Sequence, residues 1–485
     1  MMGHQPPPDD PLFSYHVQLE TRVRKDHPLR RMKQVVDFNF IYKEVEKTYG
    51  TSGNVSVPPP VILKLMLLLV LYNVRSEREL METLPERLDW LWFLDYTIET
   101  PIPDHSVLSK ARKRWGEKAF KRFFQVIVSR CVEAGLVNGD KIFVDSSFIE
   151  ADASRGSLGE RRRLDVAYDE LEKRLEEPPR SPLNARLVSS TDPDASVVRQ
   201  GDNASLRYKT HRAVDEAHEV ITAVETTTGI VDDGVKLADL IVAHEAHTDM
   251  APTVVVADSK YGTVDNFLAC YDRKVTAHIK PLADRIVPYR TDTFPQDRFI
   301  YDAPSDSFTC PEGATMKRKA VIGGQWIIYA AGTTTCRLCP SRAKCTKAKT
   351  GRTVRRHVRH DALALMYARS RSKAAKRNLR IRQHLMERSF AQGVRFGMKK
   401  ARWRRLWRVQ IQEYLIASAQ NIRTLLNATK ERFGGIRNKL KDTGLAGAIA
   451  ALEQALSPPI GVLPVGAGSS LFPDPRRITT EARSP

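Results

Sequence analysis

The sequence predicts a mixed α/β fold, in which a sheet with flanking helices is preceded by an all-α domain and interrupted by a β-rich insertion that contains cysteines. Three observations lead to this prediction. Residues 28–138 carry apolar side chains at helical spacing, residues 139–282 alternate short β-branched runs with helical segments, and residues 283–355 hold four of the six cysteines. A chain of 485 residues is long enough for two to four domains.

The expected domain boundaries follow the same changes in composition. Both ends of the chain are rich in Pro, and the C-terminal end also in Gly and Ser, which is typical of flexible segments. The expected parts are a flexible N-terminus at 1–27, a helical domain at 28–138, a first part of the core at 139–282, the insertion at 283–355, core helices at 356–430 and a mostly flexible tail at 431–485.

Two segments stand out in the helical domain. The apolar run Val61–Tyr72 is interrupted by Lys64 and is shorter than the roughly 18–20 residues of a membrane span, so we expect a buried helix. A second helix is expected to begin at Asp104, a residue type that favours the N-cap position. This second helix contains four basic residues: Lys110, Arg112, Lys113 and Arg114. A short basic helix after a turn has the shape that helix-turn-helix proteins place in a DNA major groove, and an ordinary surface helix is the alternative.

The core segments are assigned by residue type. Runs rich in Val, Ile, Thr and aromatic residues predict strands at 141–149, 207–214, 218–228, 253–262 and 275–281. Helices are expected at 236–247 and 266–272, and a long helical stretch from about 361 to 427 closes the ordered part.

The net charge of +20 is concentrated in one place. Residues 351–410 contain 19 Lys and Arg residues and two acids, a net charge of +17, which leaves +3 for the other 425 residues. Trp403 and Trp407 lie among the arginines of this basic stretch. Such a concentration of charge favours a polyanionic partner, because each neutralised phosphate releases condensed counterions. A solvated helix face is the alternative.

The cysteines and the N-terminus bear on the compartment. Six cysteines in a chain of this length are too few for a disulfide scaffold, and the N-terminal residues lack the basic-then-apolar layout of a secretory signal. We therefore expect a cytoplasmic protein in a reducing compartment, with no membrane association.

Four cysteines of the insertion form a spaced cluster. Cys310, Cys336, Cys339 and Cys345 are arranged as C-x25-C-x2-C-x5-C. Thiolates at these spacings are able to surround a tetrahedral Zn²⁺, and the alternative is four unligated thiols in a β-rich insertion. The two other cysteines, Cys131 and Cys270, lie in apolar helical surroundings and are expected in the core.

Two acids follow apolar runs that predict buried strands. Asp145 ends the run Ile142–Val144, and Asp258 ends the run Val254–Ala257. Carboxylates at the ends of neighbouring strands converge, and such pairs hold Mg²⁺ for phosphodiester cleavage. For either residue alone, capping of a turn is the alternative.

A third metal ligand is expected from the basic stretch, whose acids are Asp361 and Glu387. Glu387 lies in the middle of a predicted helix among basic residues, either as a salt-bridge partner or as a metal ligand. Glu413 is the second choice.

Several motifs in this chain resemble one family. They are VDSSFIEADAS (144–154), GDNASLRYKTHRAVD (201–215), ADSKYG (257–262), the CPEG and CRLCPSRAKC cysteines, and ERSF (387–390). Together they resemble bacterial insertion-sequence transposases of the DDE type, which have a ribonuclease-H-like core, and specifically the "eleven-eighty-two" group. IPDHSVLSKARKRWG (102–116) is similar to the N-terminal domain shared with the "five" type. The resemblance covers about residues 15–428.

The resemblance implies a catalytic triad of Asp145, Asp258 and Glu387 that binds Mg²⁺ or Mn²⁺. It implies a bacterial, nucleoid-associated enzyme that cleaves double-stranded DNA at terminal inverted repeats and joins the 3′-hydroxyl ends to target DNA, working as a homodimer or higher oligomer. DNA phosphates are expected on the helical domain's basic helix and on basic side chains near the third acid, which are Arg380, Arg382, Arg395, Lys399, Arg402, Arg404 and Arg405.

The residues around Glu387 depart from the pattern of the family. Relatives often show Tyr-x2-Arg-x3-Glu-x6-Lys around the last acid, whereas Arg380, Gln383 and Val394 occupy these positions here.

Two other functions stay open: a Mg²⁺-dependent nuclease without strand transfer, and a catalytically silent DNA-binding protein derived from a transposase. Tyr208, Lys209, His211 and Tyr261 match positions that recur in the family, where packing and catalytic support are equally open roles.

Overall fold

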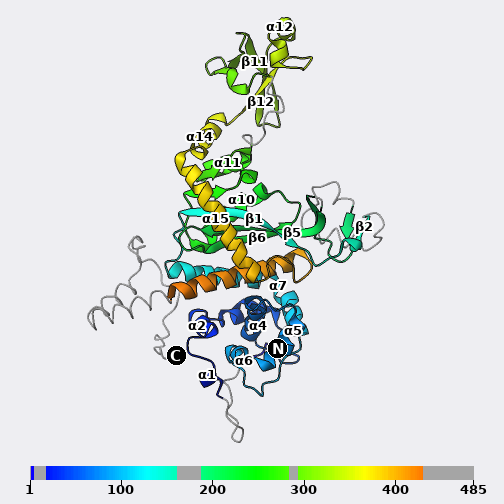
Figure 1. Ribbon diagram of the computed structural model, residues 1–485, viewed down its shortest axis with the longest axis vertical. Helices are drawn as coiled ribbons and strands as arrows, with labels where there is room; N and C mark the ends of the chain where they lie inside the picture. Colours follow the sequence, from blue (N-terminus) through cyan, green and yellow to red (C-terminus); the bar gives the residue numbers. More distant parts are fainter. Residues whose placement is uncertain (1, 5–17, 161–186, 202, 283–292, 430–485) are drawn as a thin grey trace, which may run out of the picture. The chain divides into compact units, whose positions relative to one another are not determined.

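The structure is a computed structural model that describes residues 2–4, 18–160, 187–201, 203–282 and 293–429 (Figure 1). The expected C-terminal tail lies outside the described residues, as does most of the expected flexible N-terminus. No helix among the described residues is long and apolar enough to cross a membrane.

The N-terminal part is helical, as expected. Its α-helices are α1 (Leu19–Arg22), α2 (Pro28–Val35), α3 (Phe40–Val45), α4 (Pro59–Leu71), α5 (Glu77–Thr83), α6 (Leu88–Leu94) and α7 (Ser106–Glu133). Helix α4 begins at prolines, which fit the first turn because their missing N–H has no intrahelical partner there. Its one charged side chain, Lys64, is buried and donates to Asp95 at 2.8 Å. The prediction of a buried rather than membrane-spanning helix is confirmed.

The basic helix is longer than the sequence predicted. The N-cap position is held by His105 rather than by Asp104, but the Asp104 side chain accepts a hydrogen bond from the Ser106 N–H at 2.8 Å at the helix start. Helix α7 then continues for 28 residues and bends at Gly116, whose φ of 65° is outside the helical range. The bend lets an apolar second half, with Phe120 and Phe123 fully buried, continue from the basic first half.

The central sheet has the strand order of a ribonuclease-H-like core. Its strands are β1 (Lys141–Glu150), β4 (Ser196–Gln200), β5 (Asn203–Asp215), β6 (Ile221–Thr228), β7 (Val254–Ala257) and β8 (Thr276–Ile279). The order runs β6-β5-β1-β7-β8, and β4 pairs with the first half of β5. Strands β5 and β6 are antiparallel to their neighbours, whereas β1, β7 and β8 are parallel to one another. The predicted mixed α/β class is confirmed.

Helices cover both faces of this sheet. Side chains of α10 (Leu237–Thr248), α11 (Val264–Asp272) and α14 (His360–Ser370) share a core with Ile142 and Val144 of β1. Helix α15 (Lys373–Arg395) crosses the other face (Figure 1), where Phe143 shares a core with Met386. That second core also contains Leu65 of α4 and residues of the helical segment 406–429, so the N-terminal helices and the sheet are packed together.

The insertion forms its own antiparallel sheet, as expected for a β-rich segment. The strands are β9 (Ile300–Asp302), β10 (Ser307–Thr309), β11 (Thr315–Ile322), β12 (Trp326–Ala330) and β13 (Thr353–His357), in the order β13-β12-β11-β10-β9. Two short helices, α12 (Thr333–Leu338) and α13 (Arg342–Cys345), connect β12 to β13. A short pair of strands, β2 (Leu158–Glu160) and β3 (Leu187–Ser189), lies outside both sheets.

Two buried aspartates hold the start of the helical segment 406–429. Asp192 accepts hydrogen bonds from the Arg405 N–H at 3.0 Å and from the Tyr208 hydroxyl at 2.6 Å. Asp194 accepts from the Leu406 N–H at 2.9 Å. Both carboxylates therefore satisfy N–H groups that a helix start leaves without intrahelical partners. Burial raises the pKa of Asp192 from 3.8 to about 6, although these hydrogen bonds oppose the rise.

The raised pKa predicts a pH-dependent stability. Folding keeps Asp192 protonated to a higher pH than the unfolded chain does, so its contribution to stability falls as the pH rises from about 4 to about 6. A rise in pKa from 3.8 to about 6 corresponds to about 3 kcal/mol. In thermal unfolding at pH 4 to 7, wild type is expected to lose stability relative to Asp192→Asn over this range. The exposed Asp239→Asn is the control, and parallel curves for wild type and Asp192→Asn would refute the assignment.

Candidate active site

Asp145 and Asp258 are brought together by the pairing of β1 with β7. The last registered pair of these parallel strands is Phe143 with Val256, and the two aspartates stand two residues farther along each chain. Since side chains alternate between the faces of a sheet, both carboxylates lie on the face of Phe143 and Val256, which α15 covers. Strand β7 ends at Ala257, where its apolar run ends, and is shorter than the predicted strand 253–262 because a turn follows at Ser259–Tyr261. Strand β1 continues to Glu150, so Asp145 lies within its strand rather than at its end.

The Asp145 carboxylate is held on both sides. It accepts a hydrogen bond from the Arg382 guanidinium of α15 at 2.5 Å and one from the Ser146 N–H at 2.8 Å. Burial raises the pKa of Asp145, the Arg382 charge opposes the rise, and the negative charge of Asp258 adds to it. The Asp145 side chain is 24% exposed, so a ligand from outside reaches it.

Asp258 caps the turn that follows its strand. Its Oδ1 accepts a hydrogen bond from the Lys260 N–H at 2.9 Å. The capping of a turn, which is the alternative role for Asp258, is therefore present. Asp258 both caps this turn and lies near Asp145. The pKa of Lys260 is raised: burial lowers it, but Asp233 and the two aspartates of the site outweigh burial.

Glu387 lies on the exposed side of α15. Its Oε1 accepts a hydrogen bond from Gln383 at 3.3 Å, one helical turn earlier. Arg382, which contacts Asp145, precedes Glu387 by five residues, which is about 7.5 Å along a helix axis and about 140° around it. Among the described residues, no three His, Cys, Asp or Glu side chains form a group that could hold a metal ion as they stand. The structure thus joins the two aspartates and leaves Glu387 apart from them.

Glu413, the second choice for a third ligand, has another partner. Its Oε2 lies 3.0 Å from Arg212 Nη2, and both side chains are completely buried. The carboxylate is enclosed in the protein core, so this second choice is wrong for the structure as it stands.

Lys260, which the sequence does not predict as a site residue, lies beside the aspartates. Lys260 Nζ is 3.0 Å from Asp233, which also binds the buried Lys209 at 2.7 Å. The same Lys260 lines a cavity of about 480 Å³ whose other wall residues are Ser146, Ser147, Phe148, Glu150, Arg207 and Lys399. Lys260 follows Asp258 by two residues, and this short distance along the chain is the one feature of the sequence that indicates a place for Lys260 in the site. Asp233 lies 25 residues from Asp258 along the chain, and only the fold brings it near.

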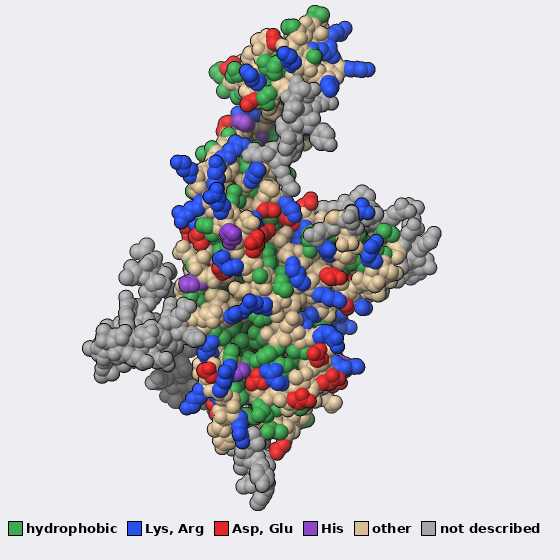
Figure 2. Space-filling model, in the orientation of Figure 1, with side chains coloured by type: hydrophobic (Ala, Val, Ile, Leu, Met, Phe, Trp, Pro, Cys, Tyr) green, Lys and Arg blue, Asp and Glu red, His purple; other side chains and the backbone are tan. Residues whose placement is uncertain are grey.

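The expected DNA-contacting residues fall into two groups. Seven are exposed, namely Lys110, Lys113, Arg114, Arg380, Arg395, Lys399 and Arg404. Figure 2 shows further Lys and Arg side chains gathered over α14 and the first half of α15.

The other four are engaged within the protein. Arg112 is 4% exposed and is bound to Glu77, so the expected DNA contact by Arg112 does not hold in this structure. The others are Arg382 on Asp145, Arg402 on Asn73 and the Val74 carbonyl, and Arg405 near Asp194. Trp403 stacks against Arg112 at 3.9 Å and donates to Glu77, so this tryptophan joins two parts of the fold.

The four residues at positions that recur in the family are all buried in the structure. Tyr208 donates to Asp192, Lys209 binds Asp233, and burial lowers the pKa of His211 to about 3. Burial also raises the pKa of Tyr261 well above its usual value, with the nearby acids adding to the rise. These contacts support the packing role for Tyr208 and His211 and place Lys209 in the network that reaches Lys260.

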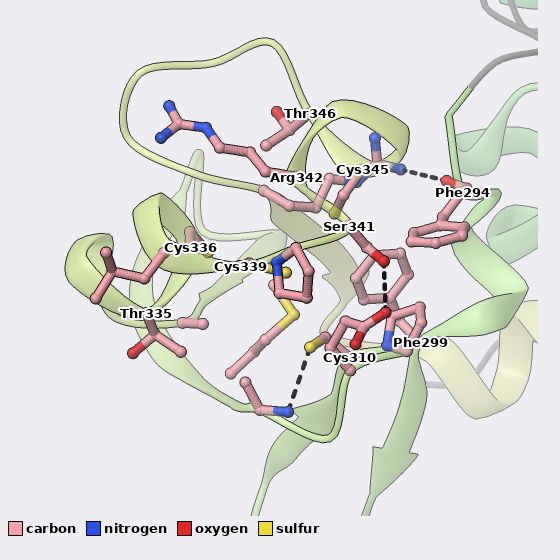
Figure 3. A pocket seen from close by; sticks show the side chains of 18 residues that line it. Phe294, Phe299, Cys310, Thr335, Cys336, Cys339, Ser341, Arg342, Cys345 and Thr346 are labelled. Atoms are coloured by element: carbon pink, nitrogen blue, oxygen red, sulfur yellow. Dashed lines mark hydrogen bonds between the residues drawn. The ribbon is translucent and has the colours of Figure 1, made fainter.

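All four cysteines of the insertion line one cavity of about 400 Å³ (Figure 3). None of them is in a disulfide. Burial raises the pKa of Cys345, Arg352 lowers it, and the other three thiols raise it further, so these three act electrostatically on Cys345. Cys131 and Cys270 are buried in the core, as expected.

Two family models match this chain, and both describe transposase domains. Residues 17–114 match a family model described as a transposase domain (DUF772), and residues 309–426 match one described as a transposase DDE domain. Glu387 lies inside the second match, whereas Asp145 and Asp258 lie between the two. No curated protein matches the chain. A cryo-EM structure of a piggyBac transposase synaptic complex with hairpin DNA is similar at 9% identity and a TM-score of 0.34, over 89% of this chain and 82% of that chain. Together, these two family matches support an insertion-sequence DDE transposase.

Proposed function

We propose that this transposase recognises the terminal inverted repeats of its own element, cuts them by metal-dependent hydrolysis and joins the freed 3′-hydroxyls to target DNA by direct transesterification. The observation that carries this proposal is the convergence of Asp145 and Asp258 on one face of the central sheet, beside a cavity lined by Lys260, Arg207 and Lys399. Two carboxylates next to a cationic cavity suit a phosphodiester substrate, since the acids hold metal and the cations hold phosphate.

The donor set fits Mg²⁺ or Mn²⁺. Asp145 and Asp258 offer hard carboxylate oxygens, and Asp145 is partly exposed. The proposed ligands are these two aspartates, with Glu387 as the third. Bound divalent ions would activate the attacking oxygen and stabilise the leaving one.

The chain's own residues have separate tasks in this proposal. Arg382 holds the Asp145 carboxylate in place through its 2.5 Å hydrogen bond. Asp233 holds Lys260 at 3.0 Å, which keeps the ammonium group at the cavity wall. Lys260, Arg207 and Lys399 would bind the phosphates that flank the cleaved bond.

Binding of the DNA ends would use the exposed cations. Lys110, Lys113 and Arg114 on α7 are proposed to contact the inverted repeat, and Arg380, Arg395 and Arg404 the DNA nearer the cleavage site. Because two element ends must be held together during transposition, we propose a homodimer or higher oligomer as the working form.

Glu387→Gln tests the third ligand. If Glu387 completes the site, the variant is expected to lose at least about 100-fold in the rate of end cleavage, since metal affinity depends on a charged ligand. The assay uses labelled end DNA in Mg²⁺, with binding followed by mobility shift. Glu133→Gln on α7 is the matched control, because it removes an exposed glutamate in another helix. Undiminished cleavage by Glu387→Gln would remove Glu387 from the site and leave the two aspartates.

A catalytically silent DNA-binding protein is the second candidate. It is favoured by the engagement of Asp145 by Arg382 and by the separation of Glu387 from the aspartates. Specific end binding by wild type, with neither cleavage nor joining in Mg²⁺ or Mn²⁺, would select it. Cleavage without joined product would select a nuclease.

A further inference from the structure

The four insertion cysteines come from separate elements and meet at one cavity. Cys310 follows β10, Cys336 lies in α12, Cys339 follows α12, and Cys345 ends α13. Figure 3 shows these side chains around the same opening, although they are up to 35 residues apart in the sequence. The fold therefore gathers four of the six cysteines of the chain at one place.

Backbone groups lie close to the sulfur atoms of two of these cysteines. Cys310 Sγ accepts a hydrogen bond from the Ala314 N–H at 3.3 Å. Gly351 has a φ of +93°, and a Cβ there would stand 2.8 Å from Cys336 Sγ, so only glycine permits this approach of the chain to the thiol. Two basic residues, Arg342 and Arg352, also line the cavity.

The part of the insertion that contains the four cysteines has a small apolar core and short helices. Its buried apolar cluster consists of Phe299, Phe308, Met316, Ile327, Tyr329 and Val354. Helices α12 and α13 have six and four residues, and neither has a side-chain cap at its start. Helices this short are not stable alone, and small domains with small cores usually depend on a metal or a disulfide.

We propose that Cys310, Cys336, Cys339 and Cys345 bind one structural Zn²⁺ ion that fixes α12 and α13 against the insertion sheet. The four thiols surround the cavity rather than a single point. Zn–S bonds of about 2.3 Å would draw them inward and close part of it. Binding releases four protons and leaves a Zn(Cys)₄ group of net charge −2, which Arg342 and Arg352 are placed to offset.

Metal analysis of the full-length protein, purified without chelator, tests this proposal. We expect about one zinc per chain in wild type and in Cys131→Ala/Cys270→Ala, and less than about one tenth of that in Cys336→Ser/Cys339→Ser. In wild type, a disulfide reagent is expected to modify four thiols only after a chelator removes the metal. Replacing zinc with Co²⁺ should give the thiolate-to-cobalt absorption of a tetrahedral sulfur site.

The readouts separate zinc from other outcomes and from catalysis. Absence of zinc together with four freely reactive thiols, a disulfide within the cluster, or iron with sulfide in place of zinc would each overturn the proposal. The thiol-protection experiment uses wild type alone, so a folding defect of the serine variant does not affect it. None of these measurements depends on DNA cleavage, so the zinc site stands or falls independently of the proposed function.

Discussion

Asp145→Asn and Asp258→Asn should each slow both cleavage and joining of DNA ends by at least about 1,000-fold, a loss of about 4 kcal/mol in transition-state stabilisation. An amide has nearly the same shape as a carboxylate but no negative charge, and it is a weak ligand for a hard divalent cation. Because phosphate contacts come from cations, the affinity for end DNA should stay within a few-fold of wild type. Gel assays on labelled end DNA measure the two chemical steps, and mobility shift measures binding.

A matched control is available close to the site. Asp152 follows the end of β1, is 43% exposed and pairs with Arg404, so Asp152→Asn removes a nearby carboxylate that is not a proposed metal ligand. This variant should retain cleavage within a few-fold. Equal activity of Asp145→Asn and Asp152→Asn would show that Asp145 does not take part in the chemistry.

The Arg212–Glu413 pair should give the largest effect on stability. Glu413→Ala is expected to lower the free energy of unfolding by about 3–5 kcal/mol, because it leaves the Arg212 charge buried without its partner. Arg212 donates to Glu413 at 3.0 Å and to Gln420 at 2.9 Å, and its guanidinium lies 5.4 Å from the Phe390 ring. The pair therefore joins β5 to α15 and to the helical segment 406–429.

Denaturant unfolding followed by tryptophan fluorescence measures this effect. The exposed pair Arg130–Glu133, at 2.8 Å, is the comparison, and Glu133→Ala should cost about 0–1 kcal/mol. Arg212→Met/Glu413→Leu should recover much of the loss, since well-packed apolar side chains often replace a buried ion pair without cost. Equal unfolding midpoints for Glu413→Ala and Glu133→Ala would contradict the account.

Local patterns in the sequence were enough to predict the main elements. The run before Asp258 predicts strand β7 because β-branched residues fit a buried strand, and the prolines before α4 predict its start. The two acids at 145 and 258 were selected because each follows such a run. Their approach then depends only on β1 and β7 being neighbours, which a resemblance to a known fold supplies.

Contacts between distant segments could not be predicted in this way. Arg112 is predicted to contact DNA and Trp403 lies among the arginines of the basic stretch, yet the two stack on each other across 291 positions of sequence. The sequence predicts that Arg382 contacts DNA, whereas its partner in the structure is Asp145, 237 positions away. Helical periodicity shows which face of a segment is apolar, but it does not show which other segment supplies the partner for a charge on that face.

Joining of a pre-cut end tests the central claim most directly. The substrate is end DNA already cut to expose the terminal 3′-hydroxyl, mixed with supercoiled plasmid and Mg²⁺, so that neither end cleavage nor its rate enters the result. Wild type is predicted to join this end to the plasmid, an end with a 3′-deoxy terminus is predicted not to be joined, and Asp145→Asn and Asp258→Asn are predicted to lack joined product while still binding the end. Joined product at wild-type levels from either variant, or none from wild type in Mg²⁺ or Mn²⁺, would contradict the assignment of strand transfer to these two aspartates.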